Sequence, residues 1–262
     1  MEISRYERPK TMDEAYSLIV EQRGLPVAGG AWMHLTVKKT ALAVDLSGLD
    51  LRYVRDVGDA IEIGAMATAR DLETSSLLAA EFGNIFSEAT SHLVGVQLRN
   101  VISVGGSVAG KFGFSDLVTV LTAMNASLRF YGGAMADISG FLAAPKDGPF
   151  FLEKIVVKKG AKAAFQSLRV TKNDFAVLNA CASFAEGGWR IAVGARPAAS
   201  RLSPAAADVL GREGAPAMEA AGRAGDAAAA ELSFGDDTRG SAEYRRAVCA
   251  VLVKRAVMEA SR

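Results

Sequence analysis

The alternation of apolar and polar residues in the first fifty positions predicts short strands and one helix. Residues 3–6 (Ile-Ser-Arg-Tyr) are expected to form a short strand. A helix is expected to begin at Thr11, because Thr11 and Glu14 have the spacing of a capping box. Further short strands are expected near residues 25–28 and 43–46. The pattern therefore indicates a small N-terminal unit of strands and a helix.

The middle of the chain changes from β alternation to helical periodicity and back. Residues 53–66 alternate around a Gly-containing turn at residues 57–59, which predicts a hairpin. Helices are expected next, at residues 69–80, 84–94 and 115–126. Ser115 is a suitable N-cap for the third of these helices. Strands are expected to follow at residues 127–131 and 154–158.

A basic, small-residue-rich stretch at residues 160–172 is expected to separate this region from a C-terminal unit. Two strand-like runs, 175–184 and 189–195, flank Glu186-Gly187-Gly188 and predict a second hairpin. The remainder predicts helices that follow the Ser203-Pro204 cap and that occupy residues 215–232 and 240–260. The expected fold class is therefore α+β, with the larger unit at the N-terminus.

Composition and charge exclude several classes of protein. Of the 262 residues 50% are hydrophobic and 23% are charged, which is typical of a globular chain, and the length suits two modest domains. Thirty Lys and Arg against 29 Asp and Glu leave a net charge of +1, so nucleic acid is not an expected partner. No apolar run approaches the ~18 residues of a membrane span, and no signal peptide is recognised, so the expected location is the cytoplasm.

The cysteines and histidines are too few for most metal sites. Cys181 and Cys249 lie in apolar surroundings and are expected to be small buried side chains. Two cysteines are too few for a four-cysteine iron–sulfur site, and with His34 and His92 the chain is poorly equipped for a structural zinc site. No metal is therefore expected in this chain.

Two glycine pairs are the strongest candidates for a binding site. Residues 27–31 (Val-Ala-Gly-Gly-Ala) are the first glycine segment and residues 103–107 (Ser-Val-Gly-Gly-Ser) the second. Paired glycines permit positive φ and carry no Cβ, so successive backbone N–H groups can converge on an anion such as a diphosphate. Neither segment matches a dinucleotide fingerprint or a phosphate loop, and each alone could be a plain turn. Two such segments could reach one ligand.

These segments carry a resemblance to a known family. Residues 27–35 resemble the A-G-G-T-x-L-L loop, and residues 97–109 the Q-I-R-N-x-x-T-I-G-G-N-I-A segment, of FAD-binding medium subunits of molybdenum hydroxylases. This is the family of xanthine dehydrogenase and carbon monoxide dehydrogenase. Further matches occur in the same order along the chain, at residues 63–65, 69–72, 114–117, 174–179, 190–194 and 237–246.

The resemblance implies a fold and a domain order. It implies a vanillyl-alcohol-oxidase (para-cresol methylhydroxylase)-type FAD-binding domain at residues 1–160, with subdomains at about 1–52 and 53–160. It further implies a carbon monoxide dehydrogenase flavoprotein-like C-terminal domain at residues 161–262.

The resemblance also implies the residues that bind the cofactor. A diphosphate would lie between the glycine segments, held by backbone amides of Ala28, Gly29, Gly30, Ala31, Trp32, Met33, His34, Ser103, Val104, Gly105, Gly106 and Ser107. Asp116 would bind a ribose hydroxyl, and the backbone near Leu152 would contact the flavin. A carboxylate in the first turn of a helix also stabilises that helix, so Asp116 has a structural alternative role.

The function implied is electron transfer. In this family electrons pass from the molybdenum cofactor through iron–sulfur clusters to FAD, and then to NAD or another acceptor. The chain would therefore be an oxidoreductase subunit whose partners are a 2Fe-2S subunit and a molybdenum-cofactor subunit. The flavin carries the chemistry, so no catalytic side chain is expected.

Several residues depart from the family pattern. Ala31, Trp32 and His34 in the first loop, Ser107 in the second, and Ser167, where a lysine commonly faces the cofactor, replace the usual side chains. These departures favour an alternative hypothesis, a flavin-free scaffold subunit of the same fold. A third hypothesis is an autonomous flavin reductase.

Overall fold

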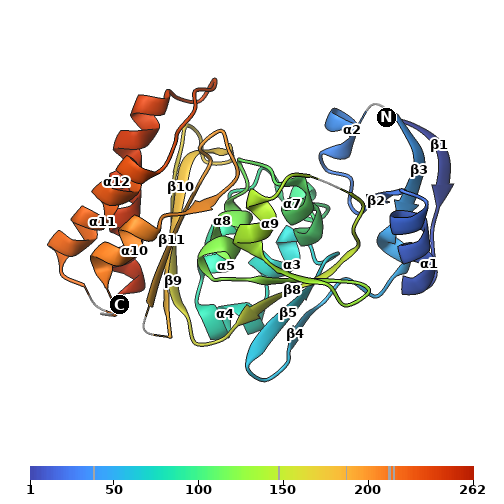
Figure 1. The fold of residues 1–262 in the computed structure, drawn as a ribbon, viewed down its shortest axis with the longest axis horizontal. Coiled ribbons are helices and arrows are strands. Elements are labelled where there is room, and N and C mark those ends of the chain that lie inside the picture. The colour runs from blue at the N-terminus through green and yellow to red at the C-terminus, as the bar shows by residue number, and fades with distance from the viewer. Residues whose placement is uncertain (38, 147, 187, 212–213, 215) are drawn as a thin grey trace.

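The computed structural model describes residues 1–262 except 38, 147, 187, 212–213 and 215, and it leaves out the side chains of His34 and Thr36. Three β-sheets follow one another along the molecule, with the N-terminal unit at one end and a layer of C-terminal helices at the other (Figure 1). This arrangement of sheets and helices confirms the predicted α+β class.

The N-terminal unit is a three-stranded parallel sheet with short helices. Its elements are β1 (Glu2–Glu7), α1 (Met12–Tyr16), a π-helical turn (Ser17–Glu21), β2 (Leu25–Val27), α2 (Met33–Thr36), β3 (Lys39–Asp45) and a 3-10 turn (Leu46–Gly48). Strands β1 and β2 both pair with β3. Thr11 caps α1 by accepting the N–H of Glu14 at 3.2 Å, but the Glu14 carboxylate accepts the N–H of Lys10. The predicted capping box is therefore wrong in its second half.

The central unit is built on a five-stranded antiparallel sheet of order β4-β5-β8-β6-β7. Its strands are β4 (Val54–Asp56), β5 (Ala60–Gly64), β6 (Ser127–Phe130), β7 (Met135–Asp137) and β8 (Leu152–Lys158). Its helices are α3 (Ala69–Glu73), α4 (Ser76–Phe82), α5 (Ile85–Ser91), α6 (Val96–Arg99), α7 (Val104–Gly110), α8 (Asp116–Ala123) and α9 (Ile138–Ala143). Strands β4 and β5 form the hairpin that the alternation predicts.

Two predictions for the central unit need correction. The helix expected at residues 69–80 is two helices, because Ser75 interrupts it and caps α4 by accepting the N–H of Leu78 at 3.2 Å. The second glycine segment was expected to be a loop, but it forms the first turn of α7, where Ser103 is the N-cap and accepts the N–H of Gly106. Neither glycine of this segment has positive φ.

The C-terminal unit is a four-stranded antiparallel sheet, and its helices lie on the outer face (Figure 1). The strands are β9 (Lys162–Arg169), β10 (Ala176–Ala185), β11 (Gly188–Gly194) and β12 (Arg201–Leu202). The helices are α10 (Pro204–Leu210), α11 (Met218–Glu231) and α12 (Ala242–Ala260). Strands β10 and β11 form the predicted hairpin, although Gly187 of its turn and Ala215, the expected start of α11, lie outside the described residues.

The stretch at residues 160–172, expected to separate the two units, contains a strand that was not predicted. It contains β9, which pairs with β10 along its length. Lysine and alanine have low β propensity, so the composition did not predict a strand here. The strand forms because it pairs with β10.

The C-terminal sheet belongs to two cores. One face packs against α11 and α12, where Ala180 and Ile191 are buried. From the other face Phe165, Cys181 and Ala192 enter the core of the central unit. The central and C-terminal units therefore share a buried interface along the whole sheet.

Arg245 fixes the segment that precedes α12. Its guanidinium is fully buried and donates to the carbonyl oxygens of Val177 at 2.9 Å, Gly235 at 2.7 Å and Gly240, and to the carboxylate of Asp237. One side chain thus joins α12, β10 and the connection between α11 and α12.

Both cysteines are buried and unpaired, which confirms the prediction from their surroundings. Burial raises the pKa of the Cys249 thiol to about 12 and raises that of Cys181 as well. Since the thiolate is the reactive form, neither residue should react with Ellman's reagent at neutral pH in the folded protein. Both should react after unfolding in guanidinium chloride. Rapid modification of the native chain would contradict this burial.

Candidate functional site

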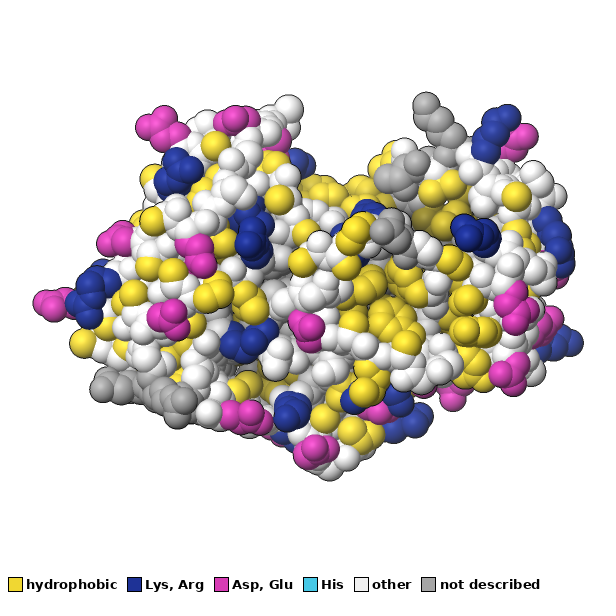
Figure 2. Space-filling model, viewed as in Figure 1, with side chains coloured by type: hydrophobic (Ala, Val, Ile, Leu, Met, Phe, Trp, Pro, Cys, Tyr) yellow, Lys and Arg dark blue, Asp and Glu magenta, His cyan; other side chains and the backbone are white. Residues whose placement is uncertain are grey.

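A cavity of about 680 Å³ lies between the N-terminal unit and the central unit. Small-molecule sites typically have volumes of ~300–1,000 Å³. One wall is formed by β2 and the residues that follow it, and the other by α7 and the residues that lead into β8. Figure 2 shows apolar side chains gathered where these two parts of the molecule meet.

Most residues that the family resemblance selects line this cavity. They are Ala28, Gly30, Ala31, Trp32, Met33, Ser103, Gly105, Gly106, Ser107 and Leu152. Gly29, Val104 and Asp116 do not line it, and the side chain of His34 lies outside the described residues. The structure therefore brings the two glycine segments and the start of β8 to one place.

The first glycine segment makes a backbone contact that glycine alone permits. A Cβ atom on Gly29 would lie 1.8 Å from the carbonyl oxygen of Val101, so the two chain segments touch through their backbones. Gly30 has φ +68°, which L side chains rarely adopt. Within the described part of the chain, the N–H groups of Gly29, Gly30 and Ala31 have no hydrogen-bond acceptor. Gly30 and Ala31 line the cavity, so their donors are available to a ligand there.

The second glycine segment presents bare backbone, and its N–H groups after Ser103 are already bonded. The N–H groups of residues 104–107 are all bonded: the first two donate to the carbonyl oxygens of Ala67 and Ala65, and the next two donate to Ser103. A Cβ atom on Gly105 would lie 2.7 Å from the Ala65 carbonyl oxygen. Glycine is therefore required here by close packing. Within the described residues, Ser103 is the member of this segment whose N–H group has no acceptor.

The cavity is positively charged. Arg23 and Lys39 line it, and no aspartate or glutamate does so among the described residues. Lys39 pairs with Glu2 at 2.9 Å on the surface, whereas Arg23 has no acidic partner in the described ranges. Cationic side chains in the same lining as unbonded N–H groups favour an anionic ligand.

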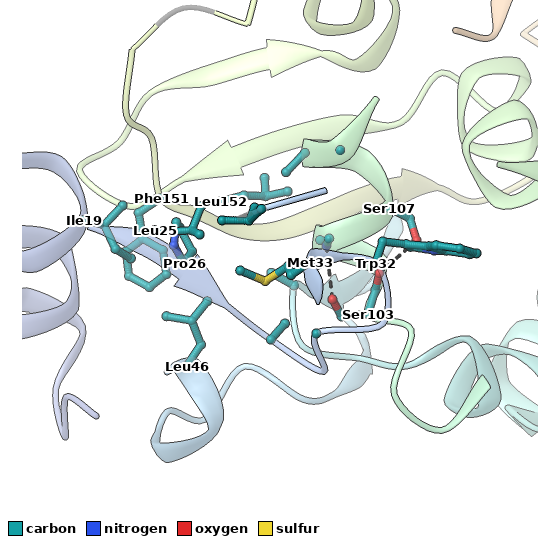
Figure 3. A pocket seen from close by; sticks show the side chains of 18 of the residues that line it. Ile19, Leu25, Pro26, Trp32, Met33, Leu46, Ser103, Ser107, Phe151 and Leu152 are labelled. Atoms are coloured by element: carbon teal, nitrogen blue, oxygen red, sulfur yellow. Dashed lines mark hydrogen bonds between the residues drawn. The ribbon is translucent and has the colours of Figure 1, made fainter. Parts of the chain in front are cut away.

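The two ends of the cavity differ in polarity. Figure 3 shows Ile19, Leu25, Leu46 and Phe151 together at one end, with Met33 pointing toward them. Ser103, Ser107 and the Trp32 ring lie at the other end. The site can therefore hold an elongated molecule with an apolar part and a charged part.

Comparison with known proteins decides the family. Residues 1–148 match the model of the FAD binding domain in molybdopterin dehydrogenase, and residues 163–260 match the CO dehydrogenase flavoprotein C-terminal domain. The chain belongs to the molybdopterin dehydrogenase FAD-binding family. This confirms the resemblance found in the sequence, and it confirms FAD as the cofactor expected.

Several relatives match this chain along almost its whole length. It is 27% identical to the uncharacterized protein YgfM of Escherichia coli strain K12, with 96% of this chain and 94% of that protein covered. It is also 27% identical to the carbon monoxide dehydrogenase medium chain of Hydrogenophaga pseudoflava, with 96% and 95% covered. A structure of carbon monoxide dehydrogenase from Hydrogenophaga pseudoflava, which lacks the Mo-pyranopterin moiety, matches with a TM-score of 0.87 at 26% identity, covering 98% of this chain and 96% of that chain. The oxidoreductase class is confirmed.

Asp116 lies in a buried polar network outside the cavity. It begins α8 and is fully buried. Its carboxylate pairs with the Arg169 guanidinium and accepts a hydrogen bond from the Asn179 side chain at 2.5 Å. Burial raises the pKa of the Asp116 carboxyl, while Arg169 and Asn179 act in the opposite direction. Because Asp116 is fully buried and does not line the cavity, a ribose hydroxyl bound there would not reach its carboxylate without a rearrangement.

The sequence patterns did not indicate the aromatic residues that line the cavity. Phe112, Phe150 and Phe151 line it. The Phe112-Gly113-Phe114 repeat directly after the second glycine segment was an available signal. Ser167, selected because a lysine is common there in the family, lies on β9 opposite Asn179 and does not line the cavity.

Among the described residues, no group of three or more His, Cys, Asp and Glu side chains is placed to hold a metal ion. None of the described helices is long and apolar enough to cross a membrane.

Proposed function

We propose that the chain binds FAD in the cavity between the glycine segments, with the diphosphate at the unbonded N–H groups of residues 29–31. The absence of Cβ atoms in both segments, the charge of Arg23 and Lys39, and the absence of a lining carboxylate among the described residues support this placement. The backbone near Leu152 would face the flavin. The observation that carries the proposal is the set of three successive N–H groups without acceptors.

The residues of this chain bind and orient the cofactor. The apolar end around Ile19, Leu25 and Phe151 would exclude water from the bound molecule. When bound, FAD supplies the redox chemistry, and no side chain need act as a nucleophile or base. We leave Asp116 out of the binding set, because Arg169 and Asn179 already occupy its carboxylate.

We further propose that the chain is the medium subunit of a molybdenum hydroxylase complex. Its partners would be a 2Fe-2S subunit and a molybdenum-cofactor subunit, since the similar proteins include a carbon monoxide dehydrogenase medium chain. Electrons would enter from the 2Fe-2S subunit and leave to NAD or another acceptor. With NAD⁺ as acceptor, two electrons and one proton give NADH. We propose the cytoplasm as its location, where thiols such as Cys181 and Cys249 stay reduced.

The domain boundaries are part of the same proposal. We propose an FAD-binding domain at residues 1–160, divided near residue 52, and a C-terminal domain at residues 161–262. The placement of one β-sheet in each of these three parts supports the division.

Flavin retention tests the proposed function. The full chain, alone and purified with its partners, is incubated with micromolar FAD and passed through gel filtration, and the visible absorbance of the protein peak is recorded. We expect stoichiometric flavin and no NAD(P)H turnover by the isolated chain. A flavin-free peak would instead support the scaffold hypothesis, and NAD(P)H oxidation by the chain alone would support an autonomous flavin reductase.

A further inference from the structure

Four aromatic rings meet at the polar end of the cavity and form what we call the aromatic cluster: Trp32, Phe112, Phe114 and Phe175. The Trp32 ring lies 5.2 Å from Phe114 edge to face, 5.4 Å from Phe175 and 6.4 Å from Phe112, measured between ring centroids. Phe114 and Phe175 are 4.4 Å apart. Such separations are typical of favourable aromatic pairs.

The aromatic cluster joins parts of the chain that are far apart in sequence. Trp32 follows the first glycine segment in the N-terminal unit, Phe112 and Phe114 follow α7, and Phe175 directly precedes β10 of the C-terminal unit. The guanidinium of Arg239 lies 5.3 Å from the centroid of the Phe175 ring. The cluster therefore connects all three units.

Trp32 directly follows the residues that carry the unbonded N–H groups, so the aromatic cluster can affect ligand binding. The N–H groups of residues 29–31 have no protein acceptor, so no hydrogen bond of their own holds them in place. The contact of Gly29 with Val101 fixes one end of the segment, and the Trp32 ring fixes the other. Ordering such a segment on binding would cost conformational entropy, whereas a segment ordered in advance binds more tightly.

We propose that Trp32 is a positioning residue that holds the first glycine segment against the C-terminal unit, so that FAD affinity depends on the contact between Trp32 and Phe175. The inference rests on the proposed FAD site. It assigns to the C-terminal unit a part in cofactor affinity through Phe175, which lies outside the cavity lining.

The test compares Trp32→Ala, Trp32→Phe, Phe175→Ala and the double variant Trp32→Ala/Phe175→Ala. Phe184→Ala is the matched control, since Phe184 pairs with Trp189 at 5.2 Å in the C-terminal sheet and does not line the cavity. FAD dissociation constants are measured by flavin fluorescence at a temperature where circular dichroism shows every variant folded. Limited proteolysis of the FAD-free proteins reports separately on cleavage within residues 28–37.

We expect Trp32→Ala and Phe175→Ala each to weaken FAD binding about 10- to 100-fold, because each removes the contact between the Trp32 and Phe175 rings. The double variant should be little worse than either single variant, Trp32→Phe should restore most of the affinity, and Phe184→Ala should match wild type. Cleavage within residues 28–37 should accelerate in Trp32→Ala and not in Trp32→Phe.

Wild-type affinity and unchanged proteolysis in Trp32→Ala would overturn the inference while leaving the proposed function intact. Additive losses in the double variant would also overturn it, since they would show that the two rings act independently. If wild type binds no FAD, the proposed function fails, and with it the dependence of affinity on Trp32.

Discussion

Gly29→Ala should abolish detectable FAD binding and destabilise the folded chain. The added methyl carbon would lie 1.8 Å from the carbonyl oxygen of Val101 and 2.6 Å from its carbonyl carbon. Both obstacles are backbone atoms, so the two segments must separate, and overpacking of this kind costs about 1–3 kcal/mol or more. Separation would move the donors of residues 29–31 away from the opposite wall, and we expect the FAD dissociation constant to rise at least ~100-fold. Isothermal titration with FAD and urea unfolding measure the two effects.

Gly222→Ala makes the same chemical change where space is free. A Cβ atom on Gly222, in α11, meets no atom within 4 Å. Alanine is favoured over glycine in helices, so we expect unchanged FAD affinity and a gain in the free energy of unfolding of about 0.5–1 kcal/mol. A Gly29→Ala protein that bound FAD as wild type does would show that the contact with Val101 does not shape the site.

The segments that line the candidate site could be selected from the sequence because their requirements are partly local. Gly30 is needed for a positive φ, and a glycine pair after a short strand is a direct sign of such a turn. The pairing of the two glycine segments in one cavity was predicted from their shared composition and from the family pattern. The structure of the second segment was not predicted. Glycine is required at position 105 because the carbonyl oxygen of Ala65 lies close to it in space, and Ala65 is far from Gly105 in sequence.

The remaining errors have the same physical origin. Strand β9 carries residues of weak β propensity and is set by its pairing with β10. The partners of Asp116 come from β9 and β10, so its sequence neighbours could not show that its carboxylate is already occupied. The contacts of Trp32 likewise come from other units. Local patterns located the backbone of the site, whereas contacts between units determine which groups remain free for a ligand.

The shared core joins the C-terminal unit to the central unit, which forms one wall of the cavity. Phe165 and Cys181 fill the core of the central unit from the C-terminal sheet, and Asp116 and Arg169 form an ion pair across the same interface. Loss of this interface would therefore disturb α8 and α7 on the cavity side. The polar network at Asp116 is the place where a single substitution tests this dependence.

Asp116→Ala should lower the free energy of unfolding by about 3–5 kcal/mol, because it leaves the buried charge of Arg169 without its partner. The Arg169 side chain is 7% exposed, so water cannot replace the carboxylate without local opening. The donor of Asn179 would also lose its acceptor. Urea unfolding followed by circular dichroism measures the change.

The double variant Asp116→Ala/Arg169→Met separates the cost of an unpaired charge from the cost of lost packing. Removal of both charges should recover much of the stability, since a buried ion pair contributes little net stability compared with apolar residues in its place. Glu7→Ala is the surface control, because the pair of Glu7 with Arg5 is exposed and should leave the urea midpoint unchanged. If Asp116→Ala and the double variant were equally unstable, the loss would come from packing around α8, and the ion pair would not be what joins the two units.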